Sequence, residues 1–189
     1  MNAMMKPARL SLEAYLAWEA GQELKHELVN GRPRMMAGAA KIHNRVCANI
    51  IRHLGNRLAG KPCQPYGSDM KFISPTGNAR YPDVQVDCAP FRGDDLISED
   101  PRVIIEVLSP ANDWLDVQRR LADYQAHPAV RHILFVSTQK IAAQAYAREA
   151  DGWLEQTLES LEGGFALLAI GAELTMAEIY EGIEFAAGE

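Results

Sequence analysis

The chain has 189 residues, of which 48% are apolar and 23% charged, and its formal net charge is −6. This length suits one α/β domain with a sizeable core and is short for two, so we expect a single domain over residues 1–189. The negative charge argues against a protein that coats nucleic acid through a basic surface. An enzyme acting on nucleic acid needs only a local basic strip.

The sequence also limits where the protein works. No apolar stretch approaches the roughly 20 residues needed to cross a bilayer, and the first residues lack the apolar region of a signal peptide. We therefore expect a cytoplasmic protein. Cys47, Cys63 and Cys88 are far apart and include no CxxC pair, which argues against a disulfide framework or a zinc site. Three buried or half-buried thiols are the prediction.

The first elements are predicted from capping, turn and periodicity signals. Ser11 opens a helix over residues 11–19. Asn30-Gly31 lies between two arms of a β-hairpin, because a tight turn needs positive φ at both positions. Over residues 41–58, apolar residues recur every fourth position, which predicts an amphipathic helix packed on a sheet. These residues are Ile42, Val46, Ile50, Leu54 and Leu58.

The rest of the chain alternates strand and helix patterns. Strands are expected over residues 67–74, 81–87, 102–109 and 132–137, and a helix over 116–127. Asp151-Gly152 is a second hairpin signal, and Thr175 with Glu178 matches the capping box of a short terminal helix. A strand–helix–strand unit with added hairpins indicates an α/β fold, with a central mixed sheet flanked by helices.

Two carboxylates stand out within the predicted strands. Glu106 lies in an apolar, β-branched run that reads as a strand buried on both faces, where an ionised carboxylate is costly unless it is paired or bound to a metal. Asp83 opens another strand. Adjacent strands lie about 4.8 Å apart, so the two carboxylates could share one Mg²⁺, with the Val107 carbonyl as a further ligand.

Each of these residues also has a structural explanation. Glu106 could form a buried ion pair with an arginine, and Asp83 could cap a turn after Pro82. Taken together, the two favour the metal site. By themselves, Glu27 reads as an exposed residue at the start of a hairpin arm, and His43 as a solvated residue in the first turn of a helix.

Asp116, Arg120 and Tyr124 are spaced four residues apart and therefore share one face of the predicted helix. On spacing alone, Asp116 and Arg120 form an ordinary surface ion pair. Arg120 could instead reach over the strand ends toward a phosphate, and the periodicity leaves both readings open.

As a whole the pattern resembles the Uma-type family of restriction endonucleases, first described as a domain of unknown function, in the PD-(D/E)xK nuclease superfamily. The resemblance runs from about Leu10 to about Tyr180. The matching residues are Glu27-Leu-Val-Asn-Gly31, His43, Pro82-Asp83-Val84, Ile105-Glu-Val-Leu-Ser-Pro110, Asp116, Arg120 and Tyr124.

The resemblance implies a restriction-endonuclease-like fold and Mg²⁺- or Mn²⁺-dependent DNA hydrolysis. Asp83 and Glu106 would match the metal carboxylates of the family. Glu27 would match an early acidic residue that often completes the site, and His43 a histidine at the same point of the family pattern.

The chain departs from the superfamily at one position. The usual lysine two residues after the glutamate is replaced by Leu108, and where this family commonly carries a lysine on the following helix the chain has Arg120. Arginine stays protonated and cannot act as a general base, but it can stabilise charge on a phosphate. Arg120 therefore either performs the electrostatic half of the role or marks a weakened enzyme.

Three hypotheses follow. In the favoured one the protein is a metal-dependent DNA endonuclease, with catalytic Asp83, Glu106, Arg120, Glu27 and His43, supported by Asp116 and Tyr124. A basic strip of Arg45, Arg52 and Arg57, with Lys61, would contact DNA, and cutting both strands makes a homodimer plausible. The second is a non-catalytic nucleic-acid-binding or interaction module. The third is a hydrolase of another phosphoester.

Overall fold

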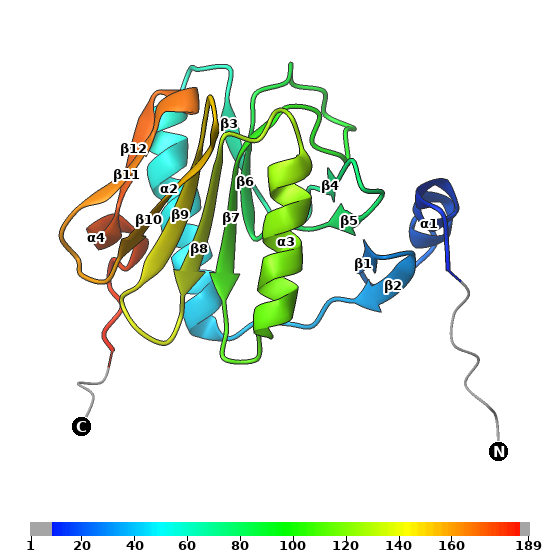
Figure 1. Cartoon of the computed structure of the whole chain (residues 1–189), viewed down its shortest axis with the longest axis horizontal. Coiled ribbons are helices and arrows are strands. Elements are labelled where there is room, and N and C mark those ends of the chain that lie inside the picture. Colours follow the sequence, from blue (N-terminus) through cyan, green and yellow to red (C-terminus); the bar gives the residue numbers. More distant parts are fainter. Residues whose placement is uncertain (1–8, 186–189) are drawn as a thin grey trace.

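A computed structural model describes residues 9–185. A six-stranded mixed sheet forms its centre (Figure 1). The strands, in spatial order, are β10 (Gly152–Leu158), β9 (Ala143–Glu149), β8 (His132–Ser137), β7 (Pro101–Leu108), β6 (Val84–Asp87) and β3 (Gln64–Gly67). The β7 and β8 strands are parallel, and the other neighbours are antiparallel. The predicted α/β fold with a central mixed sheet is confirmed.

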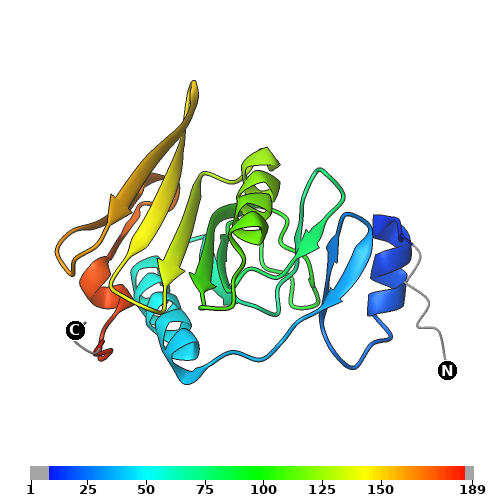
Figure 2. The same cartoon turned by 60° about the horizontal axis from the view of Figure 1, so that its bottom comes forward.

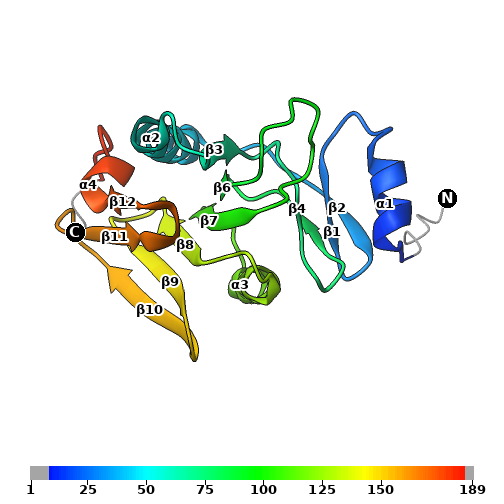
Figure 3. The same cartoon turned by 90° about the horizontal axis from the view of Figure 1, so that it is seen from above.

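Helices cover both faces of this sheet. Helix α2 (Lys41–Leu58) packs on one face and α3 (Trp114–Ala126) on the other (Figure 3). Alternate residues of β7 enter the two cores: Val103 and Ile105 pack with α2, and Ile104 packs with α3. This explains the unbroken apolar run, because both faces of the strand are buried. Among residues 9–185, no helix combines the length and hydrophobicity that a membrane crossing requires.

A smaller sheet lies at the opposite end of the molecule from the β9–β10 hairpin (Figure 2). Its spatial order is β2 (Arg32–Met35), β1 (His26–Val29), β5 (Ala79–Arg80) and β4 (Phe72–Ile73). Helix α1 (Leu12–Glu19) packs against it, with Tyr15, Leu28 and Ala79 forming a separate buried cluster. This sheet carries Glu27, so its placement beside α3 determines one wall of the site.

The C-terminal part folds back over the α2 side of the central sheet. It consists of β11 (Gly164–Leu167), the 3₁₀ helix η1 (Leu168–Ile170), β12 (Ala172–Thr175) and α4 (Met176–Ile179). Phe165, Leu174 and Ile179 join the core that α2 covers. The Thr175–Glu178 capping box is present as predicted, whereas the β11–β12 hairpin was not predicted.

Several elements agree closely with the sequence. Helix α2 and strand β8 have the predicted bounds, and Ser11 caps α1. Asn30 and Gly31 have φ values of 50° and 75°, as the tight turn between β1 and β2 requires. Helix α3 begins at Trp114, two residues before the predicted start, because the Asp113 side chain accepts a hydrogen bond from the Leu115 amide.

Two predicted elements differ in detail. The strand predicted over residues 67–74 does not form as one element: β3 ends at Gly67 and β4 begins at Phe72, because the chain turns after Gly67, where the Met70 amide donates to the Gly67 carbonyl. The β9–β10 hairpin forms, but Glu149 pairs with Gly152, so its turn residues are Ala150 and Asp151 rather than Asp151 and Gly152.

The prediction of three free thiols is wrong for Cys63 and Cys88, which form a disulfide. Strands β3 and β6 are antiparallel with Gln64 opposite Asp87, and the same register places Cys63 opposite Cys88. Their Cα atoms lie 4.0 Å apart. A separation of 25 residues gives no sign of this pairing, because it depends on how the two strands align. Cys47 remains free.

His132 of β8 leads to a prediction about acid stability. It is 7% exposed, and its Nε2 accepts a hydrogen bond from the Ala169 amide. Burial lowers the pKa of its imidazole to about 4. Below the ordinary pKa of 6.5 the unfolded chain therefore binds a proton here that the folded chain does not, so stability falls as pH falls toward 4.

We expect this proton to lower the free energy of unfolding of the wild type by about 2.5 kcal/mol between pH 7.5 and pH 4.5. The measurement is urea denaturation of the wild type and His132→Gln at both pH values. The variant should lose less stability than the wild type by that amount, because carboxylates titrate alike in both. Equal losses would show that His132 is protonated in the folded protein.

Candidate metal site in the cleft

A cavity of about 580 Å³ opens where the central sheet, the first turn of α2 and the strand β1 meet. The cleft gathers predicted site residues from distant parts of the chain. Those that line it are Glu27, His43, Asp83, Glu106, Val107, Asp116 and Arg120. Tyr124 lies beneath them, fully buried. The structure therefore places the predicted carboxylates, the histidine and the arginine in one cleft.

Asp83 immediately precedes β6, and Glu106 lies in the neighbouring antiparallel strand β7. Val84 pairs with Ile105, so the same register places Asp83 opposite Glu106. Cβ atoms of directly opposed residues lie about 5 Å apart. The Asp83 Oδ2 atom accepts a hydrogen bond of 2.7 Å from the Val107 amide, which fixes its carboxylate at the end of β7. Asp83 is therefore anchored to the neighbouring strand.

Glu106 is 5% exposed and has charged and polar partners. Its Oε1 accepts hydrogen bonds from Arg120 Nη1, at 2.8 Å, and from the Tyr124 hydroxyl. Burial raises the pKa of the Glu106 carboxyl to about 7, Asp83 acts in the same direction, and Arg120 opposes both. The ion pair that was the alternative explanation of Glu106 is thus present, and the cleft beside it is open.

Arg120 is the centre of an ionic network. Its Nη1 and Nη2 atoms each lie 3.0 Å from a carboxylate oxygen of Glu27, and its Nε lies 3.1 Å from Asp116. With the bond to Glu106, one guanidinium contacts three carboxylates. The predicted pair of Asp116 and Arg120 is confirmed, but it belongs to the wall of the cleft. Asp116 also pairs with Arg34 of β2.

Arg80 supports this network from below and was not singled out in the sequence. Its side chain is fully buried, with Nη1 3.2 Å from Glu27 and Nε 2.9 Å from Asp123. Asp123 also accepts hydrogen bonds from Asn78 and Thr76. A lone arginine at the end of a short strand carries no local signal of burial, so only the tertiary structure identifies it.

His43 connects the cleft to helix α2. Its Nε2 lies 3.2 Å from the Asp83 Oδ2, and its Nδ1 lies 3.6 Å from the Cys47 Sγ. The hydrogen bond to Asp83 raises the pKa of His43. Burial raises the pKa of the Cys47 thiol to about 12. His43 is thus a partner of Asp83 and not the solvated residue that its position alone suggested.

The residues predicted to contact DNA do not line the cleft. Arg45 is exposed on α2. Arg52 pairs with Glu181 and Arg57 with Glu178, both in the C-terminal segment. Two of the three predicted DNA contacts therefore have acidic partners within the chain.

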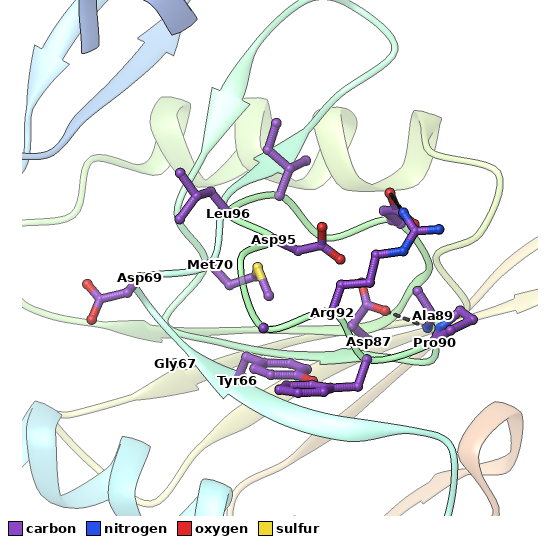
Figure 4. Close-up of a pocket in the computed structure, with 14 residues that line it drawn as sticks. Tyr66, Gly67, Asp69, Met70, Asp87, Ala89, Pro90, Arg92, Asp95 and Leu96 are labelled. Atoms are coloured by element: carbon purple, nitrogen blue, oxygen red, sulfur yellow. Dashed lines mark hydrogen bonds and ion pairs between the residues drawn. The ribbon is translucent and has the colours of Figure 1, made fainter. Parts of the chain in front are cut away.

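A second cavity, of about 330 Å³, lies between β3 and the loop after β6 (Figure 4). Asp87 points into the base of this loop and accepts hydrogen bonds from the Ala89 and Asp100 amides and from the Ser98 hydroxyl. These bonds hold the loop in place. None of the predicted catalytic or metal residues lines this cavity, so the chemistry that the sequence predicts belongs to the other cleft.

The oxygen atoms of the cleft fit a hard divalent cation. The hydrogen bonds that Asp83 and Glu106 accept from residues 9–185 reach Oδ2 and Oε1, which leaves Asp83 Oδ1 and Glu106 Oε2 for a ligand. Besides His43, whose pKa is raised by its hydrogen bond to Asp83, the network carries five carboxylates and three guanidinium groups. These groups are Glu27, Asp83, Glu106, Asp116, Asp123, Arg34, Arg80 and Arg120.

Comparison with known proteins places this architecture in a family. The family model "Uma2: Putative restriction endonuclease" matches residues 12–177. The crystal structure titled as a "putative nuclease belonging to DUF820" from Anabaena variabilis superposes with a TM-score of 0.76 over 93% of this chain and 99% of that chain. The two sequences are 11% identical, so this similarity establishes the fold.

Two curated relatives come from Synechocystis and are both named as uncharacterized proteins. One, slr1290, is 33% identical over 183 residues, covering 94% of each chain. The other, sll1609, is 27% identical over 168 residues, covering 85% of this chain and 95% of its own. The fold, the family match and these full-length relatives agree: the chain belongs to the Uma2 family and has a restriction-endonuclease-like fold.

Proposed function

We propose that the protein is a metal-dependent endonuclease that hydrolyses phosphodiester bonds in DNA. The observation that carries this proposal is that Asp83, just before β6, lies opposite Glu106 of β7, each with one carboxylate oxygen left for a ligand in an open cleft. The family description and the nuclease title of the structural neighbour support the same reaction class.

Asp83 and Glu106 would hold Mg²⁺ or Mn²⁺, with the Val107 carbonyl as a third protein ligand. Mg²⁺ binds oxygen ligands and commonly uses one or two carboxylates together with substrate phosphate. When bound, such an ion polarises a phosphodiester and lowers the pKa of a coordinated water.

Arg120 would stabilise the negative charge that develops on the phosphate. Its guanidinium lines the cleft and is 15% exposed, so a phosphate can approach it. An arriving phosphate would compete with Glu106 for Nη1, which would free the second oxygen of that carboxylate. Glu27, held by Arg80 and Arg120, would fix the position of the guanidinium. Arginine remains protonated, so its role is electrostatic and not that of a base.

A non-catalytic nucleic-acid-binding or interaction module is the second candidate. It is favoured by the bonds that Arg120 and Tyr124 make to Glu106, which occupy one of its oxygens. Calorimetry with Mn²⁺ separates the two: a working metal site binds Mn²⁺, and Asp83→Asn abolishes the binding. A module without a working site gives no such heat.

The direct test is incubation of supercoiled plasmid DNA with the purified protein and Mg²⁺ or Mn²⁺. We expect nicked and linear products, which EDTA should prevent. Asp83→Asn, prepared in the same way, should leave the plasmid supercoiled. Asp69→Asn makes the same change at a 95% exposed carboxylate outside the cleft and should cleave like the wild type.

Equal cleavage by the wild type and Asp83→Asn would assign the activity to a contaminant and contradict the proposal, as would no cleavage with either cation. DNA is the proposed partner, and a homodimer remains a prediction because cutting both strands usually takes two sites. Sedimentation of the protein with and without DNA would test it.

A further inference from the structure

Three chemically different ligand atoms meet on the α2 side of the cleft. The side chains of His43, Cys47 and Asp83 each offer one atom, and these atoms all lie within 4.8 Å of one another. His43 and Cys47 are four residues apart on α2 and therefore project from the same face of the helix. Within residues 9–185, no other group of three or more histidine, cysteine, aspartate or glutamate side chains meets this criterion.

The donor set is nitrogen, sulfur and oxygen, which differs from that of a magnesium site. Mg²⁺ takes oxygen ligands, whereas Zn²⁺ and similar transition ions bind imidazole nitrogen and thiolate sulfur strongly. Three protein ligands with a fourth position open to water or substrate is the usual arrangement of a catalytic zinc site. The chemistry of these three side chains therefore selects a thiophilic cation.

The cluster, like the pair of carboxylates, has internal contacts that a bound ion would replace. Glu106 is engaged by Arg120 and Tyr124, and it must release a partner before it binds an ion through both oxygens. His43 and Asp83 already contact each other at 3.2 Å, and their side chains are 13% and 17% exposed, so an ion can reach them from the cleft. Cys47 forms the half-buried inner side of the cluster.

We propose that His43, Cys47 and Asp83 form a binding site for a thiophilic divalent cation of the Zn²⁺ class, beside the predicted Mg²⁺ position. The two sites share Asp83. On the proposed nuclease function, an ion bound to this cluster would take a carboxylate from the Mg²⁺ site, so Zn²⁺ should inhibit Mg²⁺-dependent cleavage.

Cys47 makes the proposal directly observable. The chain has three cysteines, and Cys63 and Cys88 are joined in a disulfide, so Cys47 supplies the single free thiol. Co²⁺ bound to a thiolate gives a near-ultraviolet charge-transfer band, and carboxylate or imidazole ligands do not. Under non-reducing conditions such a band can therefore come only from Cys47.

The experiment is a Co²⁺ titration of the full chain after removal of bound metals with a chelator. We expect the wild type to show the charge-transfer band, Zn²⁺ to displace it, and Cys47→Ser to lack it. The Zn²⁺ affinity of His43→Asn and Cys47→Ser should fall at least about tenfold, a loss that even outer-shell partners of a metal produce. His53→Asn changes another histidine of the same helix and should retain the band.

Plasmid cleavage distinguishes this inference from the nuclease proposal. If Mg²⁺ supports cleavage and the wild type shows no thiolate band at saturating Co²⁺, the metal inference is wrong and the nuclease proposal stands. If the band is present and no cation supports cleavage, the nuclease proposal is wrong and the metal inference stands. Where both hold, Zn²⁺ should inhibit the wild type more strongly than Cys47→Ser. A band of equal strength in Cys47→Ser would overturn the assignment of the ligands.

Discussion

Replacing Arg80 with methionine should lower the free energy of unfolding by about 4 kcal/mol, because removing one partner of a buried ion pair leaves uncompensated charge. Arg80 is fully buried between Glu27 and Asp123, at 3.2 Å and 2.9 Å. Methionine fills a similar volume but provides no charge, so both carboxylates lose a cationic partner. Urea denaturation followed by circular dichroism measures the loss.

The matched control is Arg102→Met. Arg102 pairs with Asp100 at 2.8 Å, but its side chain is 33% exposed, and such pairs contribute about 1 kcal/mol or less. The double variant Arg80→Met/Asp123→Leu should recover part of the stability lost in Arg80→Met, because Glu27 keeps Arg120 as a partner, whereas Asp123 pairs with no other cation within residues 9–185. A loss in Arg80→Met no larger than that in Arg102→Met would contradict the structural role of Arg80.

Replacing Arg120 with glutamine should reduce the rate of DNA cleavage about a thousandfold, the upper range for removing one preorganised group that stabilises transition-state charge. Arg120 is the cationic side chain that lies directly against Glu106, and its guanidinium also contacts Glu27 and Asp116. Glutamine keeps hydrogen-bonding capacity and removes the charge. Initial rates of plasmid nicking with Mg²⁺ or Mn²⁺ measure the effect.

Arg120→Lys separates the two interpretations of this position. If the contribution of Arg120 is electrostatic, lysine keeps the positive charge but loses the two-point contact with Glu27, so its rate should lie between that of Arg120→Gln and that of the wild type. If Arg120 marks a weakened enzyme, lysine should raise the rate above that of the wild type. Cleavage by Arg120→Gln at the wild-type rate would exclude the electrostatic role. Circular dichroism of each variant checks that the fold is intact.

The sequence predicted the elements whose signals are local. Helix α2 was predicted at its observed bounds because its apolar residues repeat at helical spacing over the whole element. Strand β7 was predicted because it is apolar on both faces, and Glu106 stood out against that background. The same reasoning identified Asp83, and the two residues lie opposite each other. Their roles in metal binding and catalysis remain predictions.

Features that depend on how distant segments meet could not be predicted. The Cys63–Cys88 disulfide requires the register of β3 against β6, and spacing in the chain does not reveal it. Arg80 is buried because two carboxylates from elsewhere in the chain neutralise it. His43 and Cys47 share one face of α2 by their spacing, but only the packing of α2 on the sheet brings that face to Asp83. The sequence therefore identified residues that line the cleft, but it did not identify the buried residues that hold them in place.

Helix α1 takes no part in lining the cleft, yet its packing bears on the geometry of the cleft. Tyr15 packs in one cluster with Leu28, and its hydroxyl donates a hydrogen bond to the carbonyl of His26, so both neighbours of Glu27 are braced by this helix. A shortened chain that begins after α1 would retain all the acidic residues of the cleft. It would lose the helix that supports the strand carrying Glu27. Trimming the amino-terminal end should therefore alter the cleft at a distance.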